Sequence, residues 1–174
     1  YYYGGGSGTA PTGGASTGTY THDAVTYSFN KFTADTDLVT TDAGTADIFL
    51  LGGGGASVGD NAGGGGAGGM IWKPLHGLAA STTFAIDIGV GGTGTTAGSQ
   101  GVATQGKDTT LATTTLVAKG GGYGGDSSRD AAIGGSGGGG GRYGNLGAAA
   151  DQPTQSGDSG TYGFGFAGGD GAAG

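Results

Sequence analysis

Residues 101–107 carry the spacing of a phosphate-binding P-loop, Gly-x-x-x-x-Gly-Lys, in which backbone N–H groups and the lysine hold phosphate oxygens. The next position is Asp108, where the motif needs a serine or threonine hydroxyl for magnesium. The threonine-rich segment that follows predicts a strand, whereas the motif needs the N-terminus of a helix. We therefore attribute the match to the abundance of glycine and predict no nucleotide site.

Residues 134–138 fit the Gly-x-Ser-x-Gly nucleophile elbow of hydrolases, with a serine at position 136. That elbow needs a strand before it, a helix after it and a histidine partner. The chain has two histidines, His22 and His76, and neither stands in a recognisable catalytic context. We expect a non-enzymatic protein that needs no cofactor.

Three aspartates, Asp35, Asp37 and Asp42, are close enough in the sequence to be considered as a calcium loop. The glycine and the terminal glutamate of such a loop are absent, so we interpret these aspartates as solvated turns. We likewise interpret His76, close to Trp72, as a structural residue of a strand rather than a metal ligand. No metal site is predicted.

The charge balance argues against nucleic acid and membrane as partners. The six lysines and arginines are scattered singly, and the net charge is −7, whereas binding to a phosphate backbone needs clustered basic residues. No apolar run approaches the ~20 residues needed to span a bilayer. We therefore predict neither nucleic-acid binding nor membrane insertion.

Glycine dominates the composition, with 49 residues. Each interior glycine costs roughly 0.5–1 kcal/mol relative to alanine, so 49 of them cost on the order of 25–50 kcal/mol in conformational freedom. A folded chain must offset this cost by using the missing side chains for close approach of its backbones. Polyproline-II-type helices packed side by side provide such an approach, and their free N–H and C=O groups can pair with neighbouring helices.

Strands are the elements that would support these glycine runs. Residues 46–51 have apolar side chains on both faces and should form a central strand. Pro74 cannot donate to a ladder, so the strand over residues 70–78 should be an edge strand or a bulged one. Further strands are predicted at residues 25–32, 38–41 and 83–90. Residues 109–115 and 116–119 give either one long threonine-rich strand or two short ones. The sequence predicts an all-β fold, a jelly-roll-like β-sandwich with glycine-rich loops, polyglycine-II-type packing and essentially no α-helix.

Three regions are expected along the chain. Residues 1–22 form an N-terminal arm, which is either a flexible linker or a segment that docks on a neighbouring subunit through Tyr1, Tyr2 and Tyr3. Residues 23–125 form the β-sandwich with its glycine-rich runs. Residues 126–174 form a region of glycine runs and loops. Because the apolar strands are few, we expect oligomerisation or attachment to a larger body.

The order of these elements resembles the glycine-rich domain of bacteriophage tail-fibre and tail-tip adhesin proteins. In that family an apolar strand runs into glycines, and an Ile-x-Val-Gly-x-Gly-Gly element and a threonine-rich strand ending in glycines follow. The corresponding segments here are residues 47–55, 86–92 and 117–122. The resemblance covers roughly residues 24–141.

The resemblance implies that recognition lies on the inserts between glycine runs. The residues carried over are Asp126, Arg129, Asp130, Arg142, Tyr143 and Asn145. Loops on a rigid scaffold commonly carry binding, and tyrosine and arginine can stack on and hydrogen-bond to surface glycans or outer-membrane loops. The alternative is that these inserts are solvated spacers.

Three functions remain open at this stage. The first is a virion module of a tail fibre or appendage, extracellular, with other virion subunits and a bacterial surface glycan or outer-membrane protein as partners. The second is a self-assembling subunit of a capsid decoration or extracellular filament that binds no receptor, with strand edges as polymerisation surfaces. The third is ice binding, for which the sequence lacks a regular tripeptide repeat.

Overall fold

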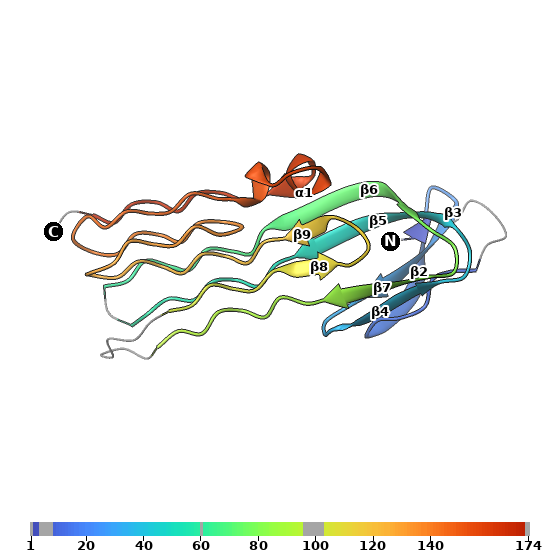
Figure 1. Ribbon diagram of the computed structural model, residues 1–174, viewed down its shortest axis with the longest axis horizontal. Helices are drawn as coiled ribbons and strands as arrows, with labels where there is room; N and C mark the ends of the chain where they lie inside the picture. Colours follow the sequence, from blue (N-terminus) through green and yellow to red (C-terminus); the bar gives the residue numbers. More distant parts are fainter. Residues whose placement is uncertain (1, 4–8, 60, 96–102, 173–174) are drawn as a thin grey trace.

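The computed structural model of the protein describes residues 2–3, 9–59, 61–95 and 103–172. The molecule is elongated, with two parts arranged end to end along its long axis (Figure 1). A β-sandwich occupies one end, and a bundle of extended glycine-rich segments leads away from it to the other end. Among the described residues, no helix is long and apolar enough to cross a membrane.

The larger sheet of the sandwich has six strands in the order β10-β6-β5-β1-β3-β2, and its neighbouring strands are antiparallel. The central position predicted for residues 46–51 is confirmed, because β5 lies inside this sheet. The strands are β1 (Tyr2–Tyr3), β2 (Ser16–His22), β3 (Val25–Lys31), β5 (Gly44–Leu51), β6 (Met70–Leu78) and β10 (Gly163–Phe164).

The smaller sheet has four antiparallel strands in the order β4-β7-β8-β9. The predicted alternation around Phe84 and Ile86 is confirmed, since both side chains are buried in β7. The threonine-rich region forms two short strands joined by a turn rather than one long strand. The strands are β4 (Thr36–Thr40), β7 (Thr82–Asp87), β8 (Thr109–Leu111) and β9 (Leu116–Ala118).

The hydrophobic core lies between the two sheets. The larger sheet contributes Leu50 and Ile71, and the smaller sheet contributes Phe84, Leu111 and Leu116, all of which are buried. Aliphatic and aromatic side chains from both sheets thus remove apolar area from water, which is the main favourable term in folding. The expected all-β sandwich is confirmed.

Two local features explain the shape of the larger sheet. The bulge expected from Pro74 is present, because the register between β5 and β6 shifts between Ala46 and Ile48, opposite the proline. Residues 16–22, which the sequence assigns to the N-terminal arm, form β2 and pair along their whole length with β3. The two strands are joined by Asp23 and Ala24, both with positive φ, as a type I′ hairpin turn requires.

The second part of the molecule, here called the polyglycine body, consists of extended segments that leave the strands and return to them (Figure 1). Glycine runs on both sides of residue 125 contribute to it, so the body is not confined to the C-terminal region of the chain. The segments are residues 52–58, 62–69, 88–95, 103–108, 119–125, 131–141, 147–151 and 165–172.

Hydrogen bonds between these segments recur every third residue. Gly52 and Gly55 donate to the carbonyl oxygens of Gly69 and Gly66, at 3.0 and 2.8 Å. A polyproline-II helix has three residues per turn and no internal hydrogen bonds, so one row of its N–H groups faces each neighbouring helix. The spacing confirms the polyglycine-II-type packing expected from the composition.

Close contact explains why these rows are glycine. A Cβ atom added to Gly52, Gly55 or Gly121 would lie closer than 3.0 Å to backbone carbonyl oxygens of a neighbouring segment. Any larger residue would force the helices apart and break the hydrogen bonds that join them. At these three positions the missing side chain is therefore what allows the helices to pack.

A short helical segment links the polyglycine body to the sandwich. It comprises a 3₁₀ helix, Gln152–Thr154, and a single α-helical turn, α1 (Asp158–Thr161). Gln152 is fully buried, and its side chain bonds to Lys119, Val117 and Ser159. These bonds attach the last part of the chain to the end of β9.

Candidate functional site

The two inserts that the resemblance marked for recognition lie together at the end of the polyglycine body, away from the sandwich. Asn145 joins them, because its side-chain amide donates to the backbone carbonyls of Asp126, at 2.6 Å, and Arg142, at 2.9 Å. Asp130 accepts a hydrogen bond of 2.8 Å from the backbone N–H of Leu146. The structure thus brings all six predicted residues to one surface, here called the tip (residues 126–130 and 142–146, with Asn61).

Inside the tip, Asp126 and Arg129 close their own loop. One carboxylate oxygen of Asp126 accepts from the backbone N–H and from the hydroxyl of Ser128, both at 2.8 Å. The other lies 3.4 Å from Arg129, whose guanidinium stands over the Tyr123 ring at 4.4 Å. The Ser128 backbone N–H is the main reason why the pKa of Asp126 is lowered from its ordinary value.

The exposure of these two side chains limits what they can bind. The Asp126 and Arg129 side chains are 17% and 27% exposed, and they are engaged with each other and with Tyr123. Both side chains mainly stabilise the loop over residues 126–130, and they leave little accessible surface for a ligand. Asp130 is exposed, but its carboxylate already accepts a hydrogen bond from the backbone N–H of Leu146.

Arg142 and Tyr143 form the accessible part of the tip. Tyr143 is 60% exposed, and the Arg142 guanidinium lies 5.0 Å from the centroid of its ring. Tyr143 has a φ of 67° and is followed by Gly144 at 77°, so the chain turns sharply and projects the ring outward. An exposed ring beside a cation can stack on the apolar face of a sugar and donate hydrogen bonds to hydroxyl or carboxylate groups.

One residue of the tip, Asn61, was missed by the sequence analysis. Asn61 accepts from Arg142 twice, through its backbone oxygen at 2.9 Å and its side-chain oxygen at 3.3 Å, and so fixes the arginine. Its φ of 59° is a conformation that asparagine tolerates, and an asparagine between two glycine runs is a turn signal. Leu146, 56% exposed, adds an apolar side chain to the same surface.

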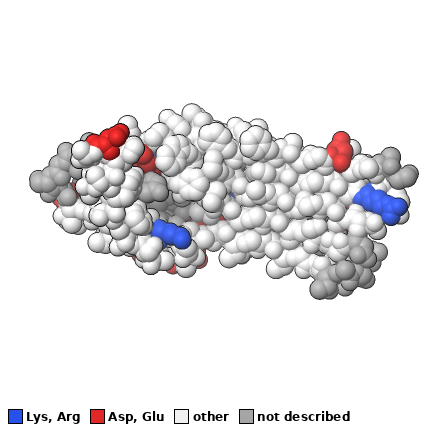
Figure 2. Space-filling model, turned by 180° about the vertical axis from the view of Figure 1, so that it is seen from behind, with Lys and Arg blue, Asp and Glu red and all other residues white. Residues whose placement is uncertain are grey.

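The surface around the tip is sparsely charged. Figure 2 shows one face of the molecule with lysine, arginine and acidic side chains near its two ends and uncharged atoms along most of the polyglycine body between them. A ligand that approaches this face meets charged side chains near the two ends rather than along most of the body. Recognition by charge on this face is therefore confined to the ends.

Of the tyrosines expected to contact another subunit, Tyr2 and Tyr3 are far from the tip. Tyr1 lies outside the described residues, while Tyr2 and Tyr3 form β1 inside the sandwich. Tyr2 pairs with Ser28 and Ala46 of the same chain. Their role in a subunit contact stays a prediction.

The motifs rejected from the sequence occupy structural positions. Lys107 lies in an extended segment that leads into β8, and its N–H donates to Val90 at 2.9 Å. Ser136 lies inside the polyglycine body and donates its N–H to Ala67 at 3.0 Å. Of the aspartates, Asp35 and Asp42 accept from backbone N–H groups, at 2.7 Å each, and thereby close loops.

Comparison with known proteins gives one match. A family model described as a glycine-rich domain matches residues 28–174, which include most of the sandwich, the whole polyglycine body and the tip. No curated protein and no solved structure gives a significant match.

Proposed function

Because the chain belongs to the glycine-rich domain family, and because its predicted recognition residues meet at one end of a packed body, we propose that it is a module of a virion tail fibre or similar appendage that attaches to a host cell through its tip. The protein is extracellular and non-enzymatic in this proposal. Its partners are other subunits of the appendage and a glycan or outer-membrane protein of the bacterial surface.

The convergence of the two inserts is the observation that carries this proposal. Asn145 ties residues that are far apart in the sequence into one surface at the end of a long support. Packed backbone helices joined by hydrogen bonds hold such a surface in a fixed orientation, which reduces the entropy lost on binding. The exposed Tyr143 and Arg142 supply a stacking platform and a cation.

The test is binding of the labelled protein to a panel of intact bacteria. We expect Arg142→Ala and Tyr143→Ala each to weaken binding to a responsive strain by about tenfold or more, as truncation of a central contact does. Lys107→Ala is the matched control for charge, since Lys107 is exposed and lies away from the tip. Retained binding in both tip variants, or binding to no strain at all, would contradict the proposal.

A second candidate is a subunit that self-assembles without a receptor. Its support is a row of exposed apolar side chains on the outer face of the larger sheet, where Phe49, 48% exposed, packs edge-on against Trp72. Leu51 and Phe164 are exposed on the same face. Ordered filaments of the pure protein in electron micrographs, together with no cell binding, would favour this function over the first.

A further inference from the structure

Strand β2 forms a free edge of the larger sheet. It pairs with β3 on one side, and among the described residues no strand pairs with it on the other. Its residues are exposed on both faces, and only Gly18 is partly covered. The strand therefore presents both faces and one edge to solvent over its whole length.

The backbone groups of β2 alternate between β3 and the free edge. The two-residue turn after β2 joins His22 to Val25 by a hydrogen bond, as turns of this kind do. Because successive residues of an antiparallel strand alternate, the polar groups of Thr21 face away from β3. The Thr21 and Thr26 hydroxyls are 3.3 Å apart, as expected for an opposed pair without backbone hydrogen bonds, whose side chains are closer. The residues whose N–H and C=O groups face the free edge are therefore Thr17, Thr19 and Thr21.

Strand β2 lacks the features by which proteins protect a free edge. Natural edges are blocked by lysine, by proline, by inward-pointing charges or by a bulge. Residues 16–22 contain no lysine, proline or carboxylate, and they pair with β3 in one unbroken register. An edge of this kind is a template for another strand.

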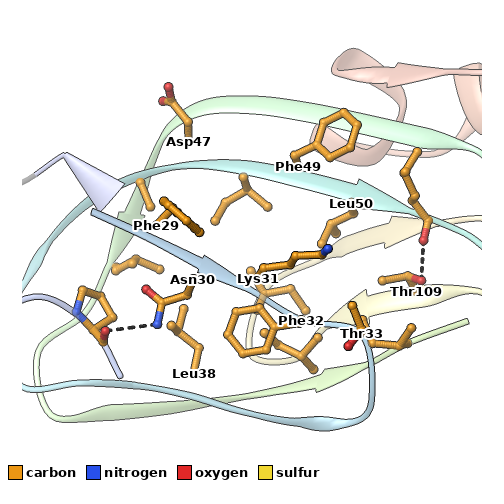
Figure 3. A pocket seen from close by; sticks show the side chains of 18 residues that line it. Phe29, Asn30, Lys31, Phe32, Thr33, Leu38, Asp47, Phe49, Leu50 and Thr109 are labelled. Carbon is orange, nitrogen blue, oxygen red and sulfur yellow. Dashed lines mark hydrogen bonds between the residues drawn. The ribbon is translucent and has the colours of Figure 1, made fainter. Parts of the chain in front are cut away.

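The hairpin of β2 and β3 is joined to the rest of the sheet over a short length. Tyr2 pairs with Ser28, and among the described residues this is the only pair that joins β3 to the sheet on that side. Further along β3, the Asn30 side chain donates to the Pro11 carbonyl at 3.2 Å, and a cavity of about 670 Å³ lies beside it (Figure 3). Two-stranded hairpins are marginal in water, whereas three or more strands support one another. A strand added at the free edge therefore stabilises this hairpin.

We propose that the free edge of β2 pairs with β2 of a second copy of this chain, antiparallel and about a two-fold axis at Thr19. In this register Thr19 lies opposite the partner's Thr19, and Thr17 lies opposite the partner's Thr21. Each outward-facing residue then meets another outward-facing residue. A shift by one residue would oppose outward groups to inward ones, and a shift by two would shorten the ladder.

The side chains in this register suit a second copy of the same strand. Threonine opposite threonine is a favourable cross-strand pair. On the other face, the partner's Tyr20 lies opposite Gly18, and the missing side chain leaves room for it beside the Phe29 ring, which lies over that glycine. The chain has a net charge of −7, but residues 16–22 bring no like charges together. A segment that complements itself in this way meets the requirement for a symmetric contact.

Sedimentation velocity of the full chain between about 10 µM and 1 mM tests the pairing, because dimerisation depends on concentration. We expect the sedimenting mass to rise from one chain to two. Thr19→Lys opposes two cations at the axis, and Thr19→Pro removes an N–H that faces the partner, so each should weaken dimerisation at least about tenfold. Thr19→Val keeps that N–H and should dimerise within about threefold of the unchanged chain. Thr83→Lys, at an exposed position of β7, is the control for charge and should also dimerise.

Cross-linking tests the register, since the chain has no cysteine of its own. Thr19→Cys should give a disulfide-linked dimer on mild oxidation, because opposed Cα atoms of a strand pair lie within the range that a disulfide spans. Thr17→Cys mixed with Thr21→Cys should cross-link at least about tenfold faster than either variant alone. Thr83→Cys should stay unlinked. If Thr19→Pro fails to fold, Thr19→Lys and the cross-links decide.

Three results would overturn the proposal. The first is the mass of one chain at the highest concentration, even if an added peptide binds the edge. The second is dimerisation that Thr19→Lys does not weaken, which would assign the contact to another surface. The third is cross-linking of Thr17→Cys alone as fast as in the mixture. The contact does not depend on host binding, so Arg142→Ala should dimerise like the unchanged chain, and a dimer that binds no bacterium would contradict only the proposed function.

Discussion

Gly121 donates its backbone N–H to the carbonyl oxygen of Gly53 at 2.8 Å, so two glycine runs far apart in the sequence are in direct backbone contact. Gly53 in turn donates to Lys107 at 2.9 Å, and a single residue therefore ties three segments together. Contacts of this kind leave no room for side chains. They allow a chain with few apolar residues to extend a long body from a small core.

The first prediction concerns glycines that differ in their surroundings. A Cβ on Gly53 would lie 2.9 Å from the carbonyl oxygen of Gly89 and closer still to Val90, whereas a Cβ on Gly64 would meet nothing within 4 Å. We expect Gly53→Ala to lower the free energy of unfolding by about 1–3 kcal/mol. Gly64→Ala should leave it unchanged or raise it by up to about 1 kcal/mol, because alanine has less freedom in the unfolded chain. Urea denaturation measures both, and equal effects would contradict the packing argument.

The second prediction concerns Gln152, which is fully buried and bonds through its side chain to Lys119, at 2.6 Å, and to Ser159, at 2.8 Å. Replacement by alanine leaves buried backbone groups unpaired, so we expect Gln152→Ala to cost about 2–4 kcal/mol of stability. Gln155→Ala, which removes one contact of 3.1 Å near the surface, should cost about 0.5 kcal/mol or less. Thermal unfolding followed by circular dichroism compares the two. A cost for Gln152→Ala no larger than that of the control would be inconsistent with its role as an anchor.

Much of the sandwich could be predicted from local pattern. The alternation around Phe84 and the apolar run that became β5 both gave strands, and Pro74 indicated the bulge. The strand predicted over residues 83–90 was too long at its end, because β7 ends at Asp87 and the chain continues into the polyglycine body. The composition indicated packed glycines, since a folded chain has to offset the conformational freedom that glycine loses, and close contact between backbones can do so. These predictions succeeded because each depends on neighbours in the sequence.

Other features depend on contacts between distant residues and could not be predicted. Strand β2 is rich in serine, threonine and glycine, the composition of a linker, and its hairpin turn contains Ala24 where asparagine or glycine would have signalled the turn. The contact between Asn61 and Arg142 joins inserts of separate glycine runs. Nothing in either local sequence indicates which runs are neighbours.

The third prediction separates the two arginines of the tip. Arg129 lies over Tyr123 and beside Asp126, so Arg129→Ala should destabilise the loop, by about 1 kcal/mol. Arg142 is exposed, so Arg142→Ala should leave the unfolding temperature within about 1 °C while it reduces cell binding. Thermal unfolding and cell binding are measured on both variants. The reverse assignment, with Arg142 stabilising and Arg129 neutral, would be a contradiction.

The fourth prediction is a pH dependence from His76 in β6. Burial lowers its pKa, and nearby Lys73 lowers it further, against a smaller opposing effect of Asp158. The unfolded chain therefore binds the proton more readily, and the free energy of unfolding should fall as the pH decreases through 6.5 toward the folded pKa. The effect is small because the ring is partly exposed.

Urea denaturation between pH 5.5 and 7.5 measures this slope. His76→Gln should flatten it. An unchanged slope in His76→Gln would assign the pH dependence to other groups.

Native-state hydrogen exchange of the polyglycine body tests the account most directly. The N–H groups of Gly121, Gly122 and Gly124 are buried and donate to carbonyls of neighbouring segments at 2.8–3.0 Å. We predict that these amides exchange at least about 1,000-fold more slowly than in an unstructured peptide, as expected for amides that open only with a large part of the fold. Exchange of all three at the rate of a free peptide would contradict the claim that bare backbone forms a packed body.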